Sequence, residues 1–312
     1  MRPGTAVATI DEFMREVAGA VRPAAILIAG PTASGKSALA LKLAGQLGGP
    51  IVNADSMQVY AELRVLTARP DASDEARASH RLYGHIPAAQ AYSVAQWLAD
   101  VAQELAAAER QGGVPIIVGG TGLYFKALTE GLSPVPEIPQ DIRARWRATA
   151  AEVPAPDLHR QLAARDAETA AALRPSDTQR IVRALEVLEA TGRPLVEWQR
   201  IPGTPLLAPQ DVRRLVVQID RNRLYERADR RFREIGEGGA LDEVRVLMAL
   251  GLDPALPAMR ALGVAPLARH LAGEISFEEA IAVGQRDTRH YIRRQSTWLR
   301  RYMIAWEMIS AQ

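Results

Sequence analysis

The chain has 312 residues, 48% of them hydrophobic, which is enough for one large or two modest domains with a real core. It has no cysteine, which excludes disulfides, Cys-ligated zinc and thiol catalysis and suits a cytoplasmic protein. The net charge is +2 and the pI is about 9.0. Nearly all the positive charge is arginine, a bias that a GC-rich genome explains at least as well as function does.

The N-terminal segment, 1–24, is expected to form a short helix or a tail. Asp11, Glu12 and Glu16 interrupt it, and it lacks the apolar core of a secretory signal. No run in the chain approaches the roughly 18 apolar residues of a membrane helix, so we expect no membrane association.

The strongest motif follows this segment. The apolar run Ile26-Leu27-Ile28 predicts a short buried strand, and the leucines from Leu39 to Leu47 predict a helix. The sequence between them fits G-x-x-x-x-G-K-[ST], in the strand–loop–helix context of a phosphate-binding loop. Loop amides and the helix N-terminus attract phosphate, Lys36 adds a full charge, and the Ser37 hydroxyl suits Mg²⁺. The expected phosphate-binding residues are Gly30, Pro31, Thr32, Ala33, Ser34, Gly35, Lys36 and Ser37.

Asp55 comes directly after a second predicted strand, Ile51–Ala54. Ligands of open parallel sheets bind at the carboxyl ends of strands, which favours a functional carboxylate; a helix-capping Asp fits the position equally well. The polar segment Leu63–Pro87 predicts an irregular functional loop or lid. His80 and His85 are isolated within it, so we expect surface or packing roles for both.

A helix capped by Ser93 precedes the next buried strand, Val114–Val118. Many phosphate-loop NTPases place an acid that helps to hold Mg²⁺ after such a strand. Here Gly119-Gly120-Thr121 follows instead. Two glycines allow close approach to the backbone and Thr121 offers a neutral hydroxyl, which favours a substrate contact over a plain tight turn.

The proline cluster Ser133–Pro139 marks a boundary, and the chain from Asp141 to about Arg200 is helical in pattern. A second Pro/Gly linker, Ile201–Pro209, leads back into a strand, Arg214–Ile219. We therefore predict an α/β fold: a P-loop NTPase-like parallel sheet core flanked by helices, with an all-helical insertion domain. The expected boundaries are 25–133 for the first part of the core, 134–204 for the insertion and 205–312 for the second part.

Arginines gather in three places. Arg180 and Arg183 share a helix face, and Arg227 and Arg231, four apart, form either a phosphate clamp or two solvated side chains. In Arg286–Arg301 arginines alternate with Tyr291 and Trp298. That pattern is typical of a single-stranded nucleic-acid surface, and also of an amphipathic helix with a solvated basic face.

Joined in order, several motifs resemble those of bacterial tRNA dimethylallyltransferases, the tRNA isopentenyl-transfer family. They are GPTASGKS, DSMQVY, TARP, HRLYG, VGGTGLYFKALTEGLSPVP, DTQRIVRALEV and RRQSTWLRR. The resemblance covers nearly the whole chain. It implies transfer of a dimethylallyl group from its diphosphate to N6 of the adenosine adjacent 3′ to the anticodon, in tRNAs that read codons starting with U.

The same resemblance implies Mg²⁺ as cofactor, and dimethylallyl diphosphate and the tRNA anticodon stem-loop as partners. Nothing in the sequence demands more than a monomer. It implies that Asp55 is the general base, that Thr121 is its neighbour in the substrate channel, and that Arg231 joins Lys36 on the donor diphosphate. The implied tRNA contacts are Asp55, Ser56, Met57, Gln58, Thr121, Arg143, Gln179, Arg180, Ile181, Val182 and Arg183.

The chain departs from the family pattern in the loop Val65–Pro70, where Leu66 replaces a usual glycine and Arg69 a usual lysine. We expect the backbone of this loop to differ. Two other functions stay open from the residues alone. A small-molecule kinase is disfavoured by the missing acid after Val118 and by the basic clusters. A non-catalytic RNA-binding protein would leave Asp55 and Thr121 unexplained.

Overall fold

The computed structural model describes residues 8–19 and 22–310. The chain divides into two compact units, one formed by residues up to 129 together with 206–312, the other by residues 130–205. Of the segment expected as an N-terminal helix or tail, the described part forms a short strand and a helix, and residues 1–7 and 20–21 lie outside the described part. None of the described helices is long and apolar enough to cross a membrane.

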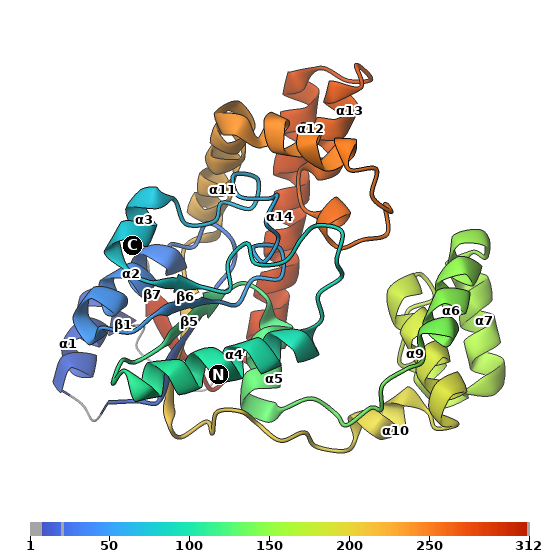
Figure 1. Cartoon of the computed structure of the whole chain (residues 1–312), viewed down its shortest axis with the longest axis horizontal. Coiled ribbons are helices and arrows are strands. Elements are labelled where there is room, and N and C mark those ends of the chain that lie inside the picture. The colour runs from blue at the N-terminus through green and yellow to red at the C-terminus, as the bar shows by residue number, and fades with distance from the viewer. Residues whose placement is uncertain (1–7, 20–21, 311–312) are drawn as a thin grey trace. The chain divides into compact units, whose positions relative to one another are not determined.

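A parallel sheet forms the centre of the larger unit (Figure 1). Within the described residues it has seven strands in the order β1-β7-β6-β2-β5-β3-β4. The strands are β1 (Ala8–Thr9), β2 (Ala25–Ala29), β3 (Ile51–Asn53), β4 (His80–Arg81), β5 (Ile116–Gly119), β6 (Val212–Gln218) and β7 (Glu307–Ser310). β6 pairs with β2 from Ala25↔Val212 to Ala29↔Val216, so a strand encoded after the helical unit lies in the middle of the sheet.

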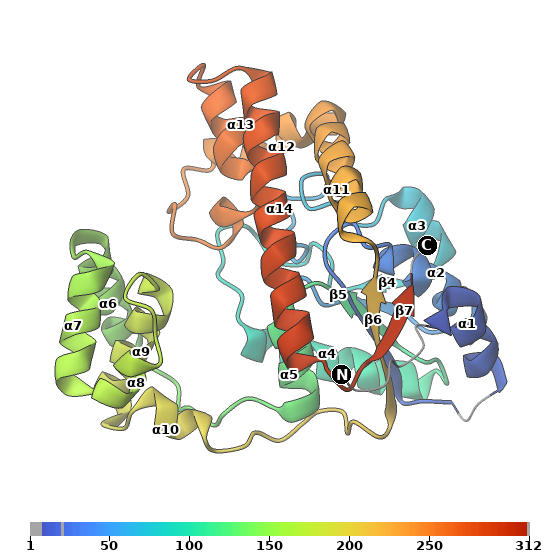
Figure 2. The ribbon, with the colours of Figure 1, turned by 180° about the vertical axis from the view of Figure 1, so that it is seen from behind.

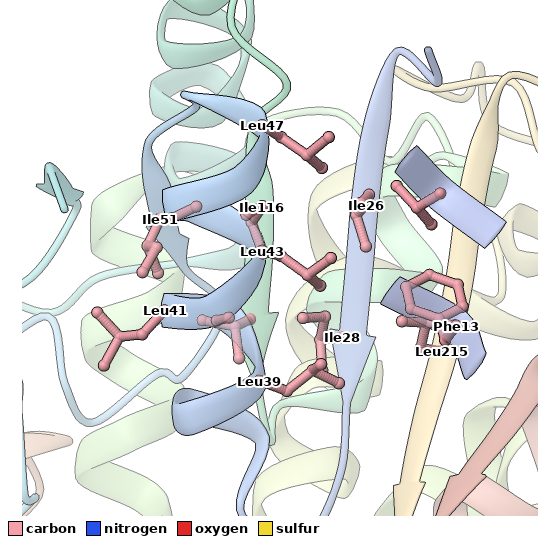
Figure 3. Packing of buried hydrophobic residues seen from close by; sticks show 14 of the residues in the cluster. Phe13, Ile26, Ile28, Leu39, Leu41, Leu43, Leu47, Ile51, Ile116 and Leu215 are labelled. Carbon is pink, nitrogen blue, oxygen red and sulfur yellow. The ribbon is translucent and has the colours of Figure 1, made fainter. Parts of the chain in front are cut away.

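Helices cover both faces of this sheet, as hydrophobic β-strands with two buried faces require. On one face, α1 (Ile10–Gly19) and α2 (Lys36–Leu47) pack onto the strands. The i, i+4 series Leu39, Leu43 and Leu47 points from α2 into this core, against Ile26 and Ile28 of β2 (Figure 3).

The other face is covered by α4 (Val94–Arg110), α5 (Gly122–Glu130) and the end of α14 (Phe277–Tyr302). Ser93 caps α4, as predicted from sequence, and forms a capping box with Gln96. Trp97 of α4 is fully buried, and its indole nitrogen donates to the carbonyl of Asn53 at 2.8 Å. This contact ties α4 to the end of β3.

After β6 the chain forms a helical layer of its own, shown from behind in Figure 2. α14 runs beside α11 and α13, and α12 packs on α13. The bounds are α11 (Arg221–Ile235), a π-helical turn Gly236–Ala240, α12 (Leu241–Ala249), a 3₁₀ turn Ala258–Arg260 and α13 (Val264–Leu271).

The second unit, 130–205, is helical. It contains α6 (Gln140–Glu152), α7 (Ala155–Arg165), α8 (Ala167–Ala171), α9 (Thr178–Thr191) and α10 (Leu195–Gln199). Its core is formed by Trp146, Leu158, Leu162 and one face of α9. Asp177 caps α9, and Gly192 ends it in the left-handed conformation, with φ 66°.

The segment Leu63–Pro87 is more regular than its polar pattern predicts. It contains α3 (Ala72–Arg77), capped by Asp71, and β4, which pairs with β3 through Ile51↔His80. The prediction of an irregular loop was wrong for these residues, because a side-chain cap and a two-residue edge strand leave no trace in hydrophobic periodicity.

Candidate active site

Apart from Arg231 of α11 (Arg221–Ile235), the sequence-predicted site residues of the larger unit follow three strands that are neighbours in the sheet, β2, β5 and β3. Ala29 pairs with Gly119, and Asn53 with Val118, so these strands end at one edge. Gly30, Thr121 and Asp55 come after them. The sheet therefore brings together three motifs that are far apart in the chain, at the edge where parallel sheets bind ligands.

The phosphate-binding loop leads from β2 into α2. Gly35 precedes the helix with φ 91°, a left-handed conformation that favours glycine. Lys36 opens the helix, and its ammonium donates to the Pro31 carbonyl at 3.3 Å. Beside this loop lies a cavity of about 430 Å³ lined by Ala33, Gly35, Lys36, Ser37, Arg227, Arg230, Arg231 and Glu234. The loop and α11 thus form the two sides of one cationic cavity.

The charges at this cavity are coupled. Burial lowers the pKa of Lys36 to about 8; Asp55 opposes this shift and Arg231 adds to it. Burial likewise lowers the pKa of Arg231, again against the charge of Asp55. Lys36 and Arg231 are both cations that burial disfavours, and a bound anion would stabilise the charge of each. The cavity therefore favours a phosphate-like group.

Asp55 is held in a tight turn after β3. Its Oδ1 accepts from the amide of Met57 at 2.9 Å, and its own amide donates to Asn53 Oδ1 at 2.8 Å. Asn53 is fully buried, and its side-chain amide also donates to the carbonyls of Asp55 and Leu82. The carboxylate therefore has a fixed position relative to the sheet edge.

Thr121 lies next to this turn. Its Oγ1 accepts from the amide of Ser56 at 2.9 Å and donates to Ser56 Oγ at 3.3 Å, and its amide donates to the Ala54 carbonyl at 3.1 Å. These hydrogen bonds join the turn that carries Asp55 directly to the turn that carries Thr121. The two predicted catalytic residues are therefore held next to each other.

The loop Val65–Pro70 contacts two predicted site residues. Gln58 donates to the carbonyls of Thr67 and Ala68 at 2.8 and 3.1 Å, and Arg231 donates to Ala68 at 3.4 Å. The positive φ in this loop is at Ala68, 50°, and Leu66 is packed in a hydrophobic core at 6% exposure. Leucine at position 66 is therefore accommodated by burial of its side chain.

Sequence reasoning missed Gln295, a residue of α14 that is 6% exposed. Its Oε1 accepts from the amide of Thr32 at 3.0 Å, and its Nε2 donates to the Gly120 carbonyl at 3.0 Å. A Cβ at Gly120 would lie 2.2 Å from that nitrogen, so a larger residue there would displace the end of the Gln295 side chain. A signal was present, because a lone glutamine occupies a core-facing position between the buried residues Ile292 and Leu299.

The arginines of Arg286–Arg301 all lie on α14, and the interleaved aromatic residues pack inward. Trp298 covers Gly122, where a Cβ would lie 2.1 Å from the indole ring, and burial raises the pKa of Tyr291. Arg289 pairs with Asp229 at 2.6 Å. The arrangement fits an amphipathic helix with a basic exposed side, which is one of the two interpretations that the sequence leaves open; binding of single-stranded nucleic acid by this helix stays a prediction.

In the helical unit the predicted RNA-contacting segment is only partly at the surface. Gln179 and Arg180 are exposed, and Arg183 is partly exposed beside Glu186 at 3.5 Å. Ile181 is fully buried and Val182 is 8% exposed, both in the core of this unit. Their side chains face the other helices and not solvent, so we remove them from the candidate RNA contacts. Arg143 of α6 is half-buried, and its Nε has no hydrogen-bond partner among the described residues.

A metal ion at the cavity would take few ligands from the protein. Among the described residues there is no group of three or more His, Cys, Asp or Glu side chains arranged to hold a metal. The exposed Ser37 hydroxyl lines the cavity beside Lys36. Such a site fits Mg²⁺, which is often bound through one or two protein oxygens together with phosphate oxygens and water.

The chain is similar to known proteins over most of its length. A sequence model of the IPP transferase family matches residues 58–302. The tRNA dimethylallyltransferase of Parvibaculum lavamentivorans is 54% identical over 288 residues, which are 92% of this chain and 91% of that protein. The enzyme of the same name from Azorhizobium caulinodans is 53% identical over 287 residues, 92% of each chain.

Two solved structures show the same fold. The tRNA isopentenylpyrophosphate transferase from Bacillus halodurans is 29% identical with a TM-score of 0.64, over 91% of this chain and 88% of that one. A eukaryotic dimethylallyltransferase, whose structures were described as snapshots of its action on tRNA, has a TM-score of 0.79 at 24% identity, over 92% and 74% of the two chains.

Proposed function

The chain belongs to the IPP transferase family, and from this premise we propose that it is a tRNA dimethylallyltransferase. In the proposed reaction, the exocyclic N6 of an adenosine next to the anticodon attacks C1 of dimethylallyl diphosphate. The N6–C1 bond forms, the C1–O bond to diphosphate breaks, and diphosphate leaves. The proton on N6 goes to Asp55 and then to solvent.

Asp55 has the position and type of group that this step needs. An exocyclic adenine amine is a weak nucleophile, because its lone pair is delocalised into the ring. A carboxylate that accepts its proton during attack typically contributes ~10²–10⁴-fold. The Met57 amide and Asn53 hold the turn that carries Asp55 in place. The hydroxyl of Thr121, which lies beside this turn, would orient the adenine.

The cavity suits the leaving group. Negative charge develops on the diphosphate as the C1–O bond breaks, and Lys36, Arg231 and the loop amides stabilise that charge. Ser37 would hold Mg²⁺ on the same oxygens, and the metal would supply further charge stabilisation there. β5 ends at Gly119, and Gly120 and Thr121 follow it in place of the acid common in NTPases, which supports binding of a prenyl diphosphate instead of ATP as fuel.

The observation that carries the proposal is geometric: the ends of β2, β5 and β3 bring the Lys36 loop, Thr121 and Asp55 to one edge of the sheet, and the electrostatics agree with this placement. The charge of Asp55 acts on the pKa of both Lys36 and Arg231, so a carboxylate base lies within range of the cationic cavity for the leaving group.

We assign the RNA contacts to the exposed arginines of α9 and to Arg143. The adenosine would have to leave its stack, at a cost of a few kcal/mol. As its substrate is tRNA, we place the protein in the cytoplasm, acting as a monomer.

The test is incubation with labelled dimethylallyl diphosphate, Mg²⁺ and a tRNA with adenosine next to the anticodon, in parallel with labelled ATP. N6-(dimethylallyl)adenosine in the digested RNA is the expected result. Phosphorylated product, or retention of RNA without prenyl transfer, would overturn the proposal in favour of a kinase or an RNA-binding protein.

A further inference from the structure

We propose that Gln295 is a positioning residue that fixes the distance between the two substrates. The inference rests on the proposed function. We call residues Gly30–Gly35 the donor loop and residues Gly119–Gly122 the acceptor loop. Gln295 contributes one hydrogen bond to each, to the amide of Thr32 and to the carbonyl of Gly120, both at 3.0 Å.

The two contacts require a side-chain amide. The Thr32 amide needs an acceptor and the Gly120 carbonyl needs a donor, and a carboxamide offers both at one end of one side chain. Ionised glutamate has no donor, and leucine or methionine would leave both backbone groups without this partner. Asparagine has the right groups on a chain that is shorter by one methylene.

The side chain is held by a rigid support. Gln295 is buried on α14, a helix of 26 residues that begins with the capping box of Ser276 and Glu279. Ile292 and Leu299, on the same face, are also buried. Trp298 presses on Gly122 at the other end of the acceptor loop. α14 therefore fixes the acceptor loop at two points and the donor loop at one.

The residues of the donor loop have two different roles: the amides of some donate to protein acceptors, and others line the cavity. Thr32 donates to Gln295, and Ser34 donates to the Pro31 carbonyl at 3.2 Å. Ala33, Gly35, Lys36 and Ser37 line the cavity. The diphosphate would then be bound by these cavity residues, while the Thr32 amide anchors the loop to α14. Because Thr121 follows Gly120, the same glutamine sets how far the adenosine lies from C1 of the donor.

Such a residue acts on the chemical step more than on binding. Each loop would still bind its own substrate after Gln295 is lost, but the attacking nitrogen and C1 would no longer be aligned. A misplacement of about 1 Å costs roughly 10²-fold in rate.

The experiment compares the full-length wild-type protein with Gln295→Leu, Gln295→Glu and Gln285→Leu. Gln285 is the matched control, because it lies on the same helix and donates to a backbone carbonyl, that of Asp229 at 2.9 Å, away from both loops. Single-turnover prenyl transfer to an anticodon stem-loop RNA is measured per folded molecule, with the Kd of dimethylallyl diphosphate and of the RNA measured separately. Circular dichroism gives the folded fraction.

We expect Gln295→Leu to lower the single-turnover rate by roughly 10- to 100-fold, with both Kd values within about threefold of wild type. Gln285→Leu should keep the wild-type rate per folded molecule. Gln295→Glu gives a signature that a structural role would not produce. A protonated carboxyl has one donor and one acceptor, like the amide, so the rate of this variant relative to wild type should rise about tenfold from about pH 8 to about pH 6.

A Gln295→Leu rate within threefold of wild type, or a loss that the Kd values account for fully, would overturn the inference. If Gln295→Leu does not fold, a ratio of Gln295→Glu to wild type that stays flat with pH would do the same. If the wild type prenylates RNA and the Gln295 variants do so at the wild-type rate, this inference is refuted and the proposed function stands. No prenylated RNA from the wild type refutes the proposed function, and with it this inference.

Discussion

Asp55 combines a local structural contact with the proposed chemical role, and the choice of variant has to separate them. One carboxylate oxygen accepts from the Met57 amide. Asparagine retains an acceptor oxygen for that amide but does not take up a proton, whereas alanine removes the turn contact as well.

We expect Asp55→Asn to reduce the single-turnover prenylation rate by ~10²–10⁴-fold, because the general base is lost. The Kd for tRNA should change little, since the turn persists. Rapid-quench kinetics and filter binding measure the two quantities. Equal loss of rate and of tRNA affinity would refute the assignment of Asp55 as base.

Lys36 makes donor binding dependent on pH. Its pKa is about 8, because burial disfavours the charged form. Below this pKa the ammonium is charged, and the affinity for dimethylallyl diphosphate should be constant. Above it the charge must be restored on binding, so affinity should fall by up to tenfold per pH unit. Donor titrations between about pH 7 and 9.5 measure this.

Two variants serve as controls for this prediction. Arginine keeps its charge over this range, so Lys36→Arg should bind more weakly but with a flat pH profile. Lys42→Ala, a change at an exposed residue of the same helix, should preserve the wild-type curve. A wild-type affinity that does not depend on pH would contradict the role of Lys36.

At the scale of elements, a single carboxylate of α12 holds the loop Val65–Pro70. Glu243 accepts from the amides of Val65 and Leu66 at 2.6 and 2.8 Å. The same loop supplies the carbonyl of Ala68 to Gln58 and Arg231. α12 is therefore linked to the active site through one segment of backbone.

Glu243→Ala should leave two amides without this acceptor and lower the free energy of unfolding by ~1–3 kcal/mol. Denaturant unfolding measures the stability, and hydrogen exchange should show faster exchange at Val65 and Leu66. Asp242→Ala is the control, because Asp242 pairs with Arg245 at the surface, with side-chain exposures of 79% and 62%. Its effect should be within about 0.5 kcal/mol. Equal effects of the two changes would argue against the anchor.

Elements were predictable where the sequence repeats a simple pattern. The strand–loop–helix around Lys36 and the capped helix after Ser93 follow from periodicity and caps. α3 and β4 do not, because α3 depends on the local cap of Asp71 and β4 consists of two residues that pair with the distant strand β3. The role of Gln295 was also hidden, since its two contacts lie 263 and 175 residues away in the chain. Sequence spacing carries no information about such distant pairs.

At the scale of the whole molecule, RNA binding and donor binding are assigned to different parts of the chain. The Arg180 side chain is 74% exposed in the helical unit, whereas Lys36 and Arg231 belong to the sheet unit. Contacts to RNA phosphates release counterions, so their loss should appear in the salt dependence of binding.

We expect Arg180→Ala to weaken tRNA binding and to lower the slope of log affinity against log salt by about one. Donor affinity should not change. Arg160→Ala, at a residue of the same unit that is 75% exposed, is the matched control and should leave the slope unaltered. The prediction fails if both variants reduce the slope alike.

The position of β6 in the sheet has a consequence for how the protein is made. β6 lies between β7 and β2, and residues 130–205 must be translated before it emerges. The helical unit is contiguous in the chain, so it can fold at the ribosome before β6 has been synthesised and can pair with β2. We expect the helical unit to fold first during synthesis, and the phosphate-binding loop to reach its final conformation only after β6 and β7 have joined the sheet.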